Sequence, residues 1–507
     1  MCGICGIWDE IRPDDVRRMV LRMHHRGPDE NGVMENDTGS LGHARLSIMD
    51  PEHGRQPIFS EDRRRAVIAN GEIYNFPELY EKLKDKHTFR TKNDSEVLLH
   101  LYEEYGEDMV NRVEGMYAFC IADEEKLFIG RDPIGIKPLY IGEKDDGSLL
   151  FTSELKTYEK HDFKLKEFPA GSFYSKASGT VNYFKVPYVE TVHLPEEEQI
   201  RQLRKTLERS VYKRLMSDVP LGTFLSGGLD SSIISALAAE KIEGLHTFSV
   251  GLPDSGDLSA ARTVADHIGS DHHEYILEEG EVMEKLSDVI YHLESFDQDL
   301  VRSAVPCYFT SRLAAEYVKV ILTGEGADEL FGGYTYYKDI DNEEVLHREL
   351  IRSISSLHNL NLQRVDRMTM AHSLEGRVPF LDLEMIEAGQ RVPVTLKLRG
   401  EPPMEKWILR KACEDLLPYD IVWRKKKQFD EGTGIADALP KFIDKAFSDE
   451  DAKEVMRKNP SVYLRSKEEA FYFTIFSDFF SGKKHIVDNV ARWIERPDFE
   501  KQAELYG

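Results

Sequence analysis

The chain has little cysteine and no long apolar run. Its 507 residues include five cysteines, and apart from Cys2 and Cys5 these stand singly along the chain. Such spacing offers no disulfide framework and fits a reducing cytoplasm. No run of about 18 apolar residues occurs, and the first residues lack a basic stretch followed by an apolar one. We therefore expect neither a membrane span nor secretion, and we expect a cytoplasmic location.

Positive charge is also in short supply. Lys and Arg together number 66 against 91 Asp and Glu, which gives a formal net charge of −25. Nonspecific binding to nucleic acid or to an anionic membrane draws most of its affinity from cationic surface. The composition therefore argues against both kinds of partner. The length leaves room for about two to four folding units, each with its own core.

The most informative segment lies between the apolar run 221–225 and a helix-like stretch at 233–239. It contains Ser226, Gly227, Gly228, Leu229, Asp230, Ser231 and Ser232. Paired glycines permit positive φ and let backbone N–H groups converge, while the dipole of the following helix favours an anion at the same point. The hydroxyls add hydrogen-bond donors, and Asp230 is suited to a cation such as Mg²⁺. This segment predicts a polyphosphate site.

No lysine follows the two glycines, so the segment is not a Walker loop that handles a γ-phosphate. A serine- and glycine-rich turn between a strand and a helix is the alternative explanation. We favour the nucleotide site because the strand context, the glycines, the acid and the hydroxyls all agree. The segment resembles the PP-loop of the N-type ATP pyrophosphatases, which split ATP into AMP and pyrophosphate. That resemblance implies activation of ATP at its α-phosphate.

A second signal is the cysteine next to the initiating methionine. Cys2 becomes the first residue if Met1 is removed, and its thiol then lies beside an α-amino group that can serve as its base. The arrangement favours a nucleophile. The alternatives are an ordinary N-terminal thiol and a C-x-x-C redox or zinc half-site with Cys5. The sequence contains no second C-x-x-C pair to complete a metal site.

Further strings connect Cys2 with a known family. They are HRGPD at 25–29, RLSI at 45–48, NGEIYN at 70–75 and DSE at 94–96. These strings resemble the glutamine amidotransferase domain of the N-terminal-nucleophile type. With the PP-loop downstream, the whole chain resembles the glutamine-hydrolysing asparagine synthetases. The resemblance implies that aspartate is adenylated to β-aspartyl-AMP and then receives ammonia freed from glutamine. It also implies glutamine, aspartate and ATP as small-molecule partners, Mg²⁺ as a cofactor and a homodimer.

The secondary-structure signals divide the chain into two domains. Residues 1–187 hold short alternating apolar runs between Gly, Pro and Asp turns, with one helix at 95–105. For these we expect the four-layer αββα fold that the resemblance implies. Residues 188–198 lack a clear period and are interpreted as a linker. In residues 199–507 helical segments alternate with short apolar strands, which predicts a doubly wound parallel α/β domain with a mostly helical C-terminal part.

Hydrolysis of glutamine requires a cation for its α-carboxylate, an anion for its ammonium group, and donors for the oxyanion. Arg45 and Asp94 suit the first two tasks, and the Asn70 side chain and Gly71 N–H suit the third. Taken alone, Arg45 is also typical of a solvated strand edge, and Asn70-Gly71 of a hairpin turn. The resemblance places glutamine against Arg45, Leu46, Ser47, Ile48, Met49, Asn70, Gly71, Glu72 and Asp94.

A group of acids follows the apolar strand at 318–322. The string TGEGADELFGG at 323–333 holds three carboxylates between glycines. An ordinary acidic turn explains one carboxylate, whereas three favour a site for a metal and an amine substrate. The resemblance implies that Asp328 joins Asp230 around Mg²⁺ and that Glu325 takes part in forming the acyl-adenylate. It further implies nucleotide contacts at Leu225, Val250, Thr323 and Gly324.

The densest basic run, RKKK at 424–427, has two explanations. A solvated helix face is the usual one. A lysine here would alternatively stabilise the negative charge that adenylation places on the α-phosphate and on pyrophosphate. The resemblance gives that role to Lys426, with Arg302 as a further phosphate contact, although the three consecutive lysines leave the register open. Asp299 and Leu300 depart from the paired threonines of many bacterial family members.

Other functions stay open on the sequence. One alternative is an amidotransferase of the same family that acts on another carboxylate, in a peptide or envelope precursor. A second is a β-lactam synthetase-like cyclase, which needs no glutamine; Cys2 and Glu325 argue against it. A third is a catalytically silent scaffold, against which four residues argue together: Cys2, Asp230, Asp328 and Lys426. The histidine pairs 24–25 and 272–273 are not expected to bind metal, because neighbouring side chains on a strand face opposite ways.

Overall fold

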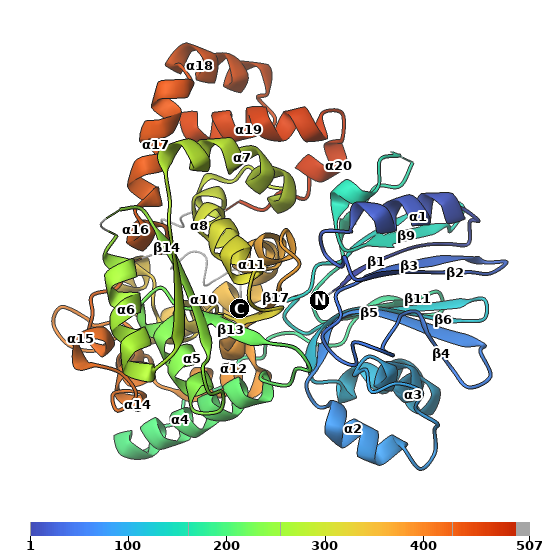
Figure 1. The fold of residues 1–507 in the computed structure, drawn as a ribbon, viewed down its shortest axis with the longest axis horizontal. Coiled ribbons are helices and arrows are strands. Elements are labelled where there is room, and N and C mark those ends of the chain that lie inside the picture. Colours follow the sequence, from blue (N-terminus) through green and yellow to red (C-terminus); the bar gives the residue numbers. More distant parts are fainter. Residues whose placement is uncertain (1, 161, 254, 428, 493–507) are drawn as a thin grey trace.

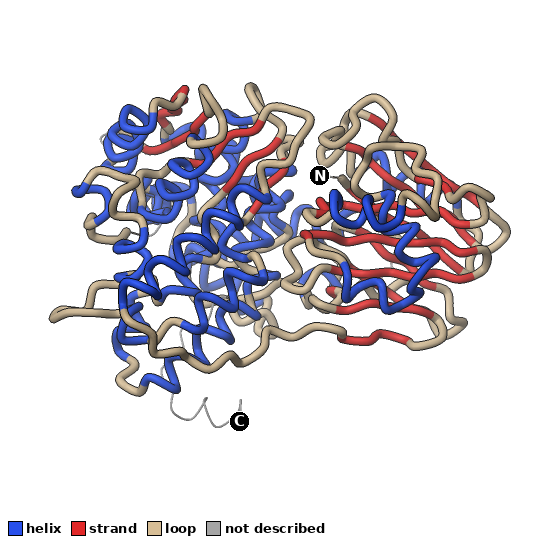
Figure 2. Tube along the Cα trace, turned by 90° about the horizontal axis from the view of Figure 1, so that it is seen from below, coloured by secondary structure: helices blue, strands red, loops and turns tan. Residues whose placement is uncertain are grey.

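The structure is a computed structural model that describes residues 2–160, 162–253, 255–427 and 429–492. The chain forms two halves that lie side by side (Figure 1). Strands dominate the N-terminal half and helices the C-terminal half (Figure 2). No helix in the described ranges combines the length and the apolar character that crossing a membrane would require.

Two stacked antiparallel sheets build the described part of the N-terminal half. The first has the order β10 (Lys166–Glu167), β8 (Tyr140–Glu143), β9 (Leu149–Thr152), β1 (Gly3–Trp8), β3 (Gly39–Arg45) and β2 (Glu30–Glu35). The second has the order β12 (Gly179–Asn182), β11 (Ser172–Ser175), β7 (Lys126–Arg131), β6 (Gly115–Asp123), β5 (Arg65–Ile73) and β4 (Ile58–Phe59). Apolar side chains between the sheets form one core, which includes Ile4, Trp8, Ile68 and Phe151.

Helices cover the outer face of each sheet. The helix α1 (Pro13–Arg22) packs Val16, Met19 and Val20 against the outer face of the first sheet. The helices α2 (Phe76–Leu83) and α3 (Glu96–Tyr105) pack on the second sheet through a separate apolar cluster. The order helix, sheet, sheet, helix confirms the predicted αββα layers.

A parallel sheet forms the centre of the C-terminal half. Its order is β15 (Asp271–Ile276), β14 (His246–Gly251), β13 (Leu221–Phe224), β16 (Val320–Leu322) and β17 (Glu375–Arg377). The chain adds strands on one side of β13 and then crosses to the other side, so a crevice opens beyond the carboxyl ends of β13 and β16. This arrangement confirms the doubly wound prediction. It also brings the predicted polyphosphate loop and the predicted metal-binding acidic loop next to each other.

Helices surround this sheet and continue to the end of the described chain. They are α4 (Glu196–Lys213), α5 (Leu229–Ala239), α6 (Gly256–Ile268), α7 (Glu279–Leu293), α8 (Gln298–Ala314), α9 (Ala327–Phe331), α10 (Glu343–Ser355), α11 (Asn361–Met370), α12 (Leu383–Arg391), α13 (Val394–Lys397), α14 (Trp407–Ala412), α15 (Tyr419–Val422), α16 (Phe429–Thr433), α17 (Ile435–Ala446), α18 (Asp449–Lys458), α19 (Lys467–Phe480) and α20 (Lys484–Val487). Sequence signals for caps recur: α8 begins where the Asp297 carboxylate accepts a hydrogen bond from Leu300 N at 3.0 Å.

Two details differ from a simple domain scheme. The part expected to be mostly helical also contributes the edge strand β17, which three residues form. The predicted linker 188–198 overlaps the start of α4 at Glu196. The boundaries at 187 and 198 stay predictions.

Buried charges join the two halves. The Arg26 guanidinium, fully buried, donates to Cys2 O at 3.1 Å, to Glu154 Oε1 at 2.9 Å, and to both carboxylate oxygens of Asp366 on α11 at 2.7 and 3.0 Å. Because a buried charge without its partner is costly, this contact holds the halves in one relative position. It also fixes the backbone that carries the Cys2 thiol.

Candidate functional site

The predicted nucleophile lies immediately before β1, with the predicted oxyanion donor Asn70 beside it. Cys2 is 7% exposed, and its backbone N–H donates to Asn70 Oδ1 at 3.0 Å. Its Sγ lies 3.9 Å from the Leu46 carbonyl oxygen. Burial raises the pKa of the Cys2 thiol. A nearby base is therefore needed to form the thiolate at neutral pH.

Asn70 and Glu72 occupy the same face of β5, because side chains alternate along a strand. Each has a buried polar atom without a hydrogen-bond partner among the described residues, Nδ2 of Asn70 and Oε1 of Glu72. Buried polar atoms in folded proteins nearly always have partners, so these two atoms indicate a ligand site. The first is a donor suited to an oxyanion and the second an acceptor suited to an ammonium group.

The predicted ammonium ligand Asp94 lies just before α3 and accepts a hydrogen bond from Ile73 N at 2.6 Å. Burial, with a contribution from the nearby Glu375, raises the pKa of Asp94 to about 7. Burial also raises the pKa of Glu72, with Asp94 contributing and Arg377 opposing. Two neighbouring buried carboxylates with raised pKa values form a site that a ligand cation would stabilise.

Arg45, at the end of β3, is 2% exposed and holds the loop that follows it. Its guanidinium donates to Glu30 Oε2 at 2.7 Å and to Asp50 O at 2.7 Å, with longer contacts to the carbonyls of Met49 and Pro51. Leu46, Ser47, Ile48 and Met49 line that loop. Their predicted contacts with glutamine, and that of Arg45 with its carboxylate, stay predictions.

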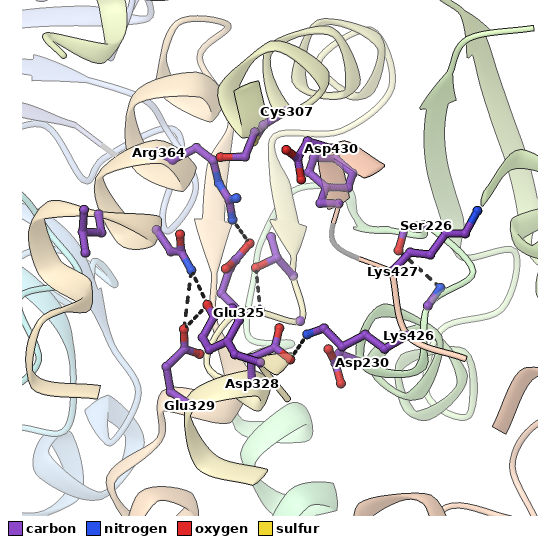
Figure 3. Close-up of a pocket in the computed structure, with 18 of the residues that line it drawn as sticks. Ser226, Asp230, Cys307, Glu325, Asp328, Glu329, Arg364, Lys426, Lys427 and Asp430 are labelled. Atoms are coloured by element: carbon purple, nitrogen blue, oxygen red, sulfur yellow. Dashed lines mark hydrogen bonds and ion pairs between the residues drawn. The ribbon is translucent and has the colours of Figure 1, made fainter. Parts of the chain in front are cut away.

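The second site is a cavity of about 1720 Å³ beyond β13 and β16 (Figure 3). The structure brings most of the predicted residues together here. Those that line it are Leu225, Ser226, Gly228, Asp230, Ser231, Val250, Thr323, Gly324, Glu325, Asp328 and Lys426. Three predicted ATP contacts, Gly227, Ser232 and Arg302, are not among the lining residues.

In the predicted PP-loop, only one of the two adjacent glycines has a left-handed backbone conformation. Gly227 has φ +69°, and a Cβ there would lie 2.5 Å from Ala260 Cβ, so the position excludes a side chain. Gly228 is extended, with φ −76°, and is the N-cap of α5. Asp230 therefore lies in the first turn of that helix, and Ser226 Oγ and Ser231 Oγ lie 3.0 Å apart.

Two lysines meet the two predicted metal ligands. The Lys406 ammonium, 3% exposed, contacts Asp230 and lies 2.7 Å from Asp328 Oδ1, and Lys426 also contacts Asp328. Figure 3 shows Lys426 pointing toward the Asp328 carboxylate. Burial alone would raise the pKa of Asp328, but the two ammonium groups outweigh burial and lower it. Asp230 Oδ1 is buried without a partner among the described residues, which leaves an oxygen for a hard cation.

Sequence reasoning missed Lys406. It precedes α14 with φ +57°, a left-handed conformation that is uncommon for lysine. Gly333 makes room for it, since a Cβ at that position would lie 1.7 Å from Asp328 Oδ1 and 2.5 Å from Lys406 Cε. A single lysine before a helix carries no motif, so the sequence offered no signal.

Sequence reasoning also missed Arg364. This residue of α11 contacts the Glu325 carboxylate (Figure 3); the Arg364 side chain is buried, and that of Glu325 is 22% exposed. Burial raises the pKa of Glu325, and Arg364 opposes the rise. The same helix carries Asp366, which binds Arg26 of the other half. One helix therefore contacts both halves of the molecule.

The remaining predicted residues have other surroundings. Arg302, on α8, donates through Nε to Glu468 Oε1 at 2.8 Å. In the basic run, Lys426 reaches Asp328 whereas Lys425 and Lys427 are exposed, which supports the predicted register. In the histidine pair 272–273, the Nε2 atom of His273 lies 3.0 Å from Nδ1 of His246 on β14.

The chain is similar to known families along nearly its whole length. Residues 1–203 match the glutamine amidotransferase domain, and residues 202–345 and 338–489 match asparagine synthase. Asparagine synthetase B [glutamine-hydrolyzing] of Escherichia coli is 39% identical, over 95% of this chain and 91% of that protein. A probable glutamine-hydrolysing asparagine synthetase of Dictyostelium discoideum is 37% identical over 97% and 96%. Asparagine synthetase 1 of Arabidopsis thaliana is 38% identical over 95% and 87%.

Proposed function

The chain belongs to the glutamine-hydrolysing asparagine synthetases, and on that premise we propose how its two sites divide the reaction. The overall reaction transfers ammonia from glutamine to aspartate and splits ATP into AMP and pyrophosphate. The curated relatives do not favour the other acceptors or the cyclase that the sequence left open. The assignment of residues to steps rests on the contacts of each site.

The first site hydrolyses glutamine. The Cys2 thiolate attacks the side-chain amide carbon, after its proton has passed to the α-amino group that removal of Met1 exposes. The oxyanion accepts hydrogen bonds from Asn70 Nδ2 and Gly71 N–H. Glu72 and Asp94 hold the ammonium group of the substrate. The proton then passes to the departing nitrogen, ammonia leaves, and water hydrolyses the thioester to glutamate.

The second site adenylates aspartate. The side-chain carboxylate of aspartate attacks the α-phosphorus of ATP, and pyrophosphate departs. Lys426 and Lys406 stabilise the negative charge that develops on the phosphate oxygens. Asp230 and Asp328 offer the oxygen ligands that Mg²⁺ prefers, and the unpartnered Asp230 Oδ1 fits that cation. When bound there, Mg²⁺ would neutralise charge on pyrophosphate.

Glu325 lines the same cavity, and to the role in forming the acyl-adenylate that the resemblance implies for it we add a role in the second half-reaction. Ammonia attacks the acyl carbon of β-aspartyl-AMP, AMP departs, and the nitrogen loses a proton. A carboxylate with a raised pKa near the reacting carbon is suited to accept that proton. Arg364 holds Glu325 in place.

One observation carries this proposal: a single cavity is lined by residues from three distant segments, namely Asp230, Glu325, Asp328 and Lys426. Mass spectrometry of a reaction with amide-¹⁵N-glutamine, ATP, Mg²⁺ and aspartate tests it. We expect labelled asparagine together with AMP. Labelled ammonia and glutamate without asparagine would show a working first site and a different acceptor. A cytoplasmic location and a homodimer stay predictions.

A further inference from the structure

The strand β17 belongs to the ATP-binding half, yet its side chains enter the glutamine site. Glu375 and Arg377 share one face of the strand, and both are fully buried. Arg377 Nη2 lies 3.1 Å from Glu72 Oε2, and Arg377 Nε donates to Glu375 Oε1 at 2.7 Å. A residue predicted to bind glutamine is therefore held by an arginine from the other half of the chain.

The two oxygens of the Glu72 carboxylate have different surroundings. Oε2 accepts from Arg377. Oε1 is buried and has no hydrogen-bond partner among the described residues. A carboxylate anchored through one oxygen presents the other in a fixed direction. The free oxygen is then available to an ammonium group.

Arg377 cannot easily follow a moving partner, because its other groups are also held. Its Nη1 donates to Arg214 O at 2.7 Å and to Met216 O at 2.6 Å. Its carbonyl accepts from Thr323 N at 2.9 Å, at the end of β16 and two residues before Glu325. The guanidinium is thus fixed by the backbone that follows α4, and the Arg377 carbonyl ties the same residue to the strand that carries the adenylation loop.

We propose that Arg377 is a positioning residue of the glutamine site, supplied by the ATP-binding half, that holds Oε2 of Glu72 so that Oε1 faces the ammonium group of glutamine. This inference rests on the proposed function, because it takes Glu72 as a ligand of that ammonium. On this proposal the glutamine site is built from residues of both halves of the chain. The geometry of β16 and β17 then contributes to glutamine affinity as well as to adenylation.

The test compares Arg377→Met with Arg377→Lys in the full-length protein, measured as glutaminase without ATP or aspartate. In Arg377→Met we expect the KM for glutamine to rise by about tenfold or more, and kcat to stay within about threefold. Lysine keeps the positive charge but not the forked guanidinium, so the KM of Arg377→Lys should lie between that of the wild type and that of Arg377→Met. Ammonia-dependent synthesis, which uses the other cavity, should stay within about threefold of wild type.

Glu114→Gln is the matched control. Glu114 pairs with Lys213 across the same two halves at 3.1 Å, is 56% exposed, and contacts no predicted glutamine ligand through its side chain. Its glutamine KM should equal that of the wild type. A KM for Arg377→Met within about twofold of wild type, or equal losses in glutaminase and ammonia-dependent synthesis, would overturn the proposal.

If Arg377→Met does not fold, Arg377→Lys decides: a raised KM with kcat retained supports the proposal, and an unchanged KM refutes it. The wild-type glutaminase rate separates this test from the proposed function. A wild type without glutaminase activity would refute the function of the site itself, whichever residue holds Glu72.

Discussion

The ammonium group of Lys406 lies 2.7 Å from the carboxylate of Asp328, and the same ammonium contacts Asp230. It thereby joins the first turn of α5, which follows β13, to the first turn of α9, which follows β16. Lys426 contacts Asp328 from a different segment. The two predicted metal ligands are therefore held by protein cations at the point where pyrophosphate is proposed to leave.

Replacement of Lys406 by methionine should impair adenylation and leave glutamine hydrolysis intact. We expect aspartate-dependent AMP formation to fall by about a hundredfold, since a preorganised cation at the leaving group is lost. Chromatography of AMP against ATP measures the effect. Lys425→Met is the control, because Lys425 lines the same cavity but is exposed. Equal losses in both variants would count against a specific role for Lys406.

Cys2→Ala should abolish synthesis from glutamine and spare synthesis from ammonia. The thiolate is the proposed nucleophile, so we expect glutaminase to fall by about a thousandfold or more. Asparagine formed from ammonium salts, ATP and aspartate should stay close to the wild-type rate. Cys5→Ala is the control, because Cys5 is buried against Val16 and takes no part in the proposed reaction. Glutamine-dependent synthesis that survives in Cys2→Ala would remove Cys2 from the mechanism.

Glutamine affinity should rise with pH. Burial raises the pKa of Asp94 to about 7, so below that pH the carboxyl group is increasingly neutral and cannot pair with an ammonium group. Between about pH 6 and pH 8 the dissociation constant for glutamine should therefore fall as Asp94 ionises. Calorimetry with Cys2→Ala avoids turnover. Asp94→Asn should bind more weakly with a flatter profile; tighter binding at low pH would contradict the assignment.

Glu325→Gln should uncouple glutamine hydrolysis from asparagine synthesis. It removes the proposed proton acceptor and leaves Arg364 without its carboxylate partner. We expect asparagine formation to fall by about a hundredfold with either nitrogen source, while glutaminase continues. The ratio of glutamate to asparagine, measured by amino-acid analysis, should rise accordingly. An unchanged ratio would place Glu325 outside the chemistry.

The sequence predicts the parts of the sites whose chemistry is local. Asp230 and Asp328 each follow a short apolar strand within a glycine-containing loop, and strand ends of a parallel sheet meet at one edge, so their meeting was predictable. Lys406 reaches the cavity from the position before α14 and Arg364 from α11, and neither residue belongs to a distinctive local pattern. Their positions depend on how helices pack on the sheet, which one sequence does not specify.

The layers of both halves were predictable for the same reason. Short apolar runs such as the one in β6 indicate strands, and the strand-to-helix alternation after Glu196 indicates a parallel sheet. The strand β17 was missed because three residues are too few to show a period. It also carries Arg377, so the contact between the two sites was invisible in the sequence.

The contact of Arg26 with both Cys2 and Asp366 constrains how such a chain can be recombined. A chimaera that joins the first half of this protein to the second half of a relative must supply a carboxylate where Asp366 stands. Without it, the buried guanidinium would lose its main counter-charge beside the nucleophile. The buried charges at the interface between the two halves therefore form a matched set, and a chimaera must keep that set complete.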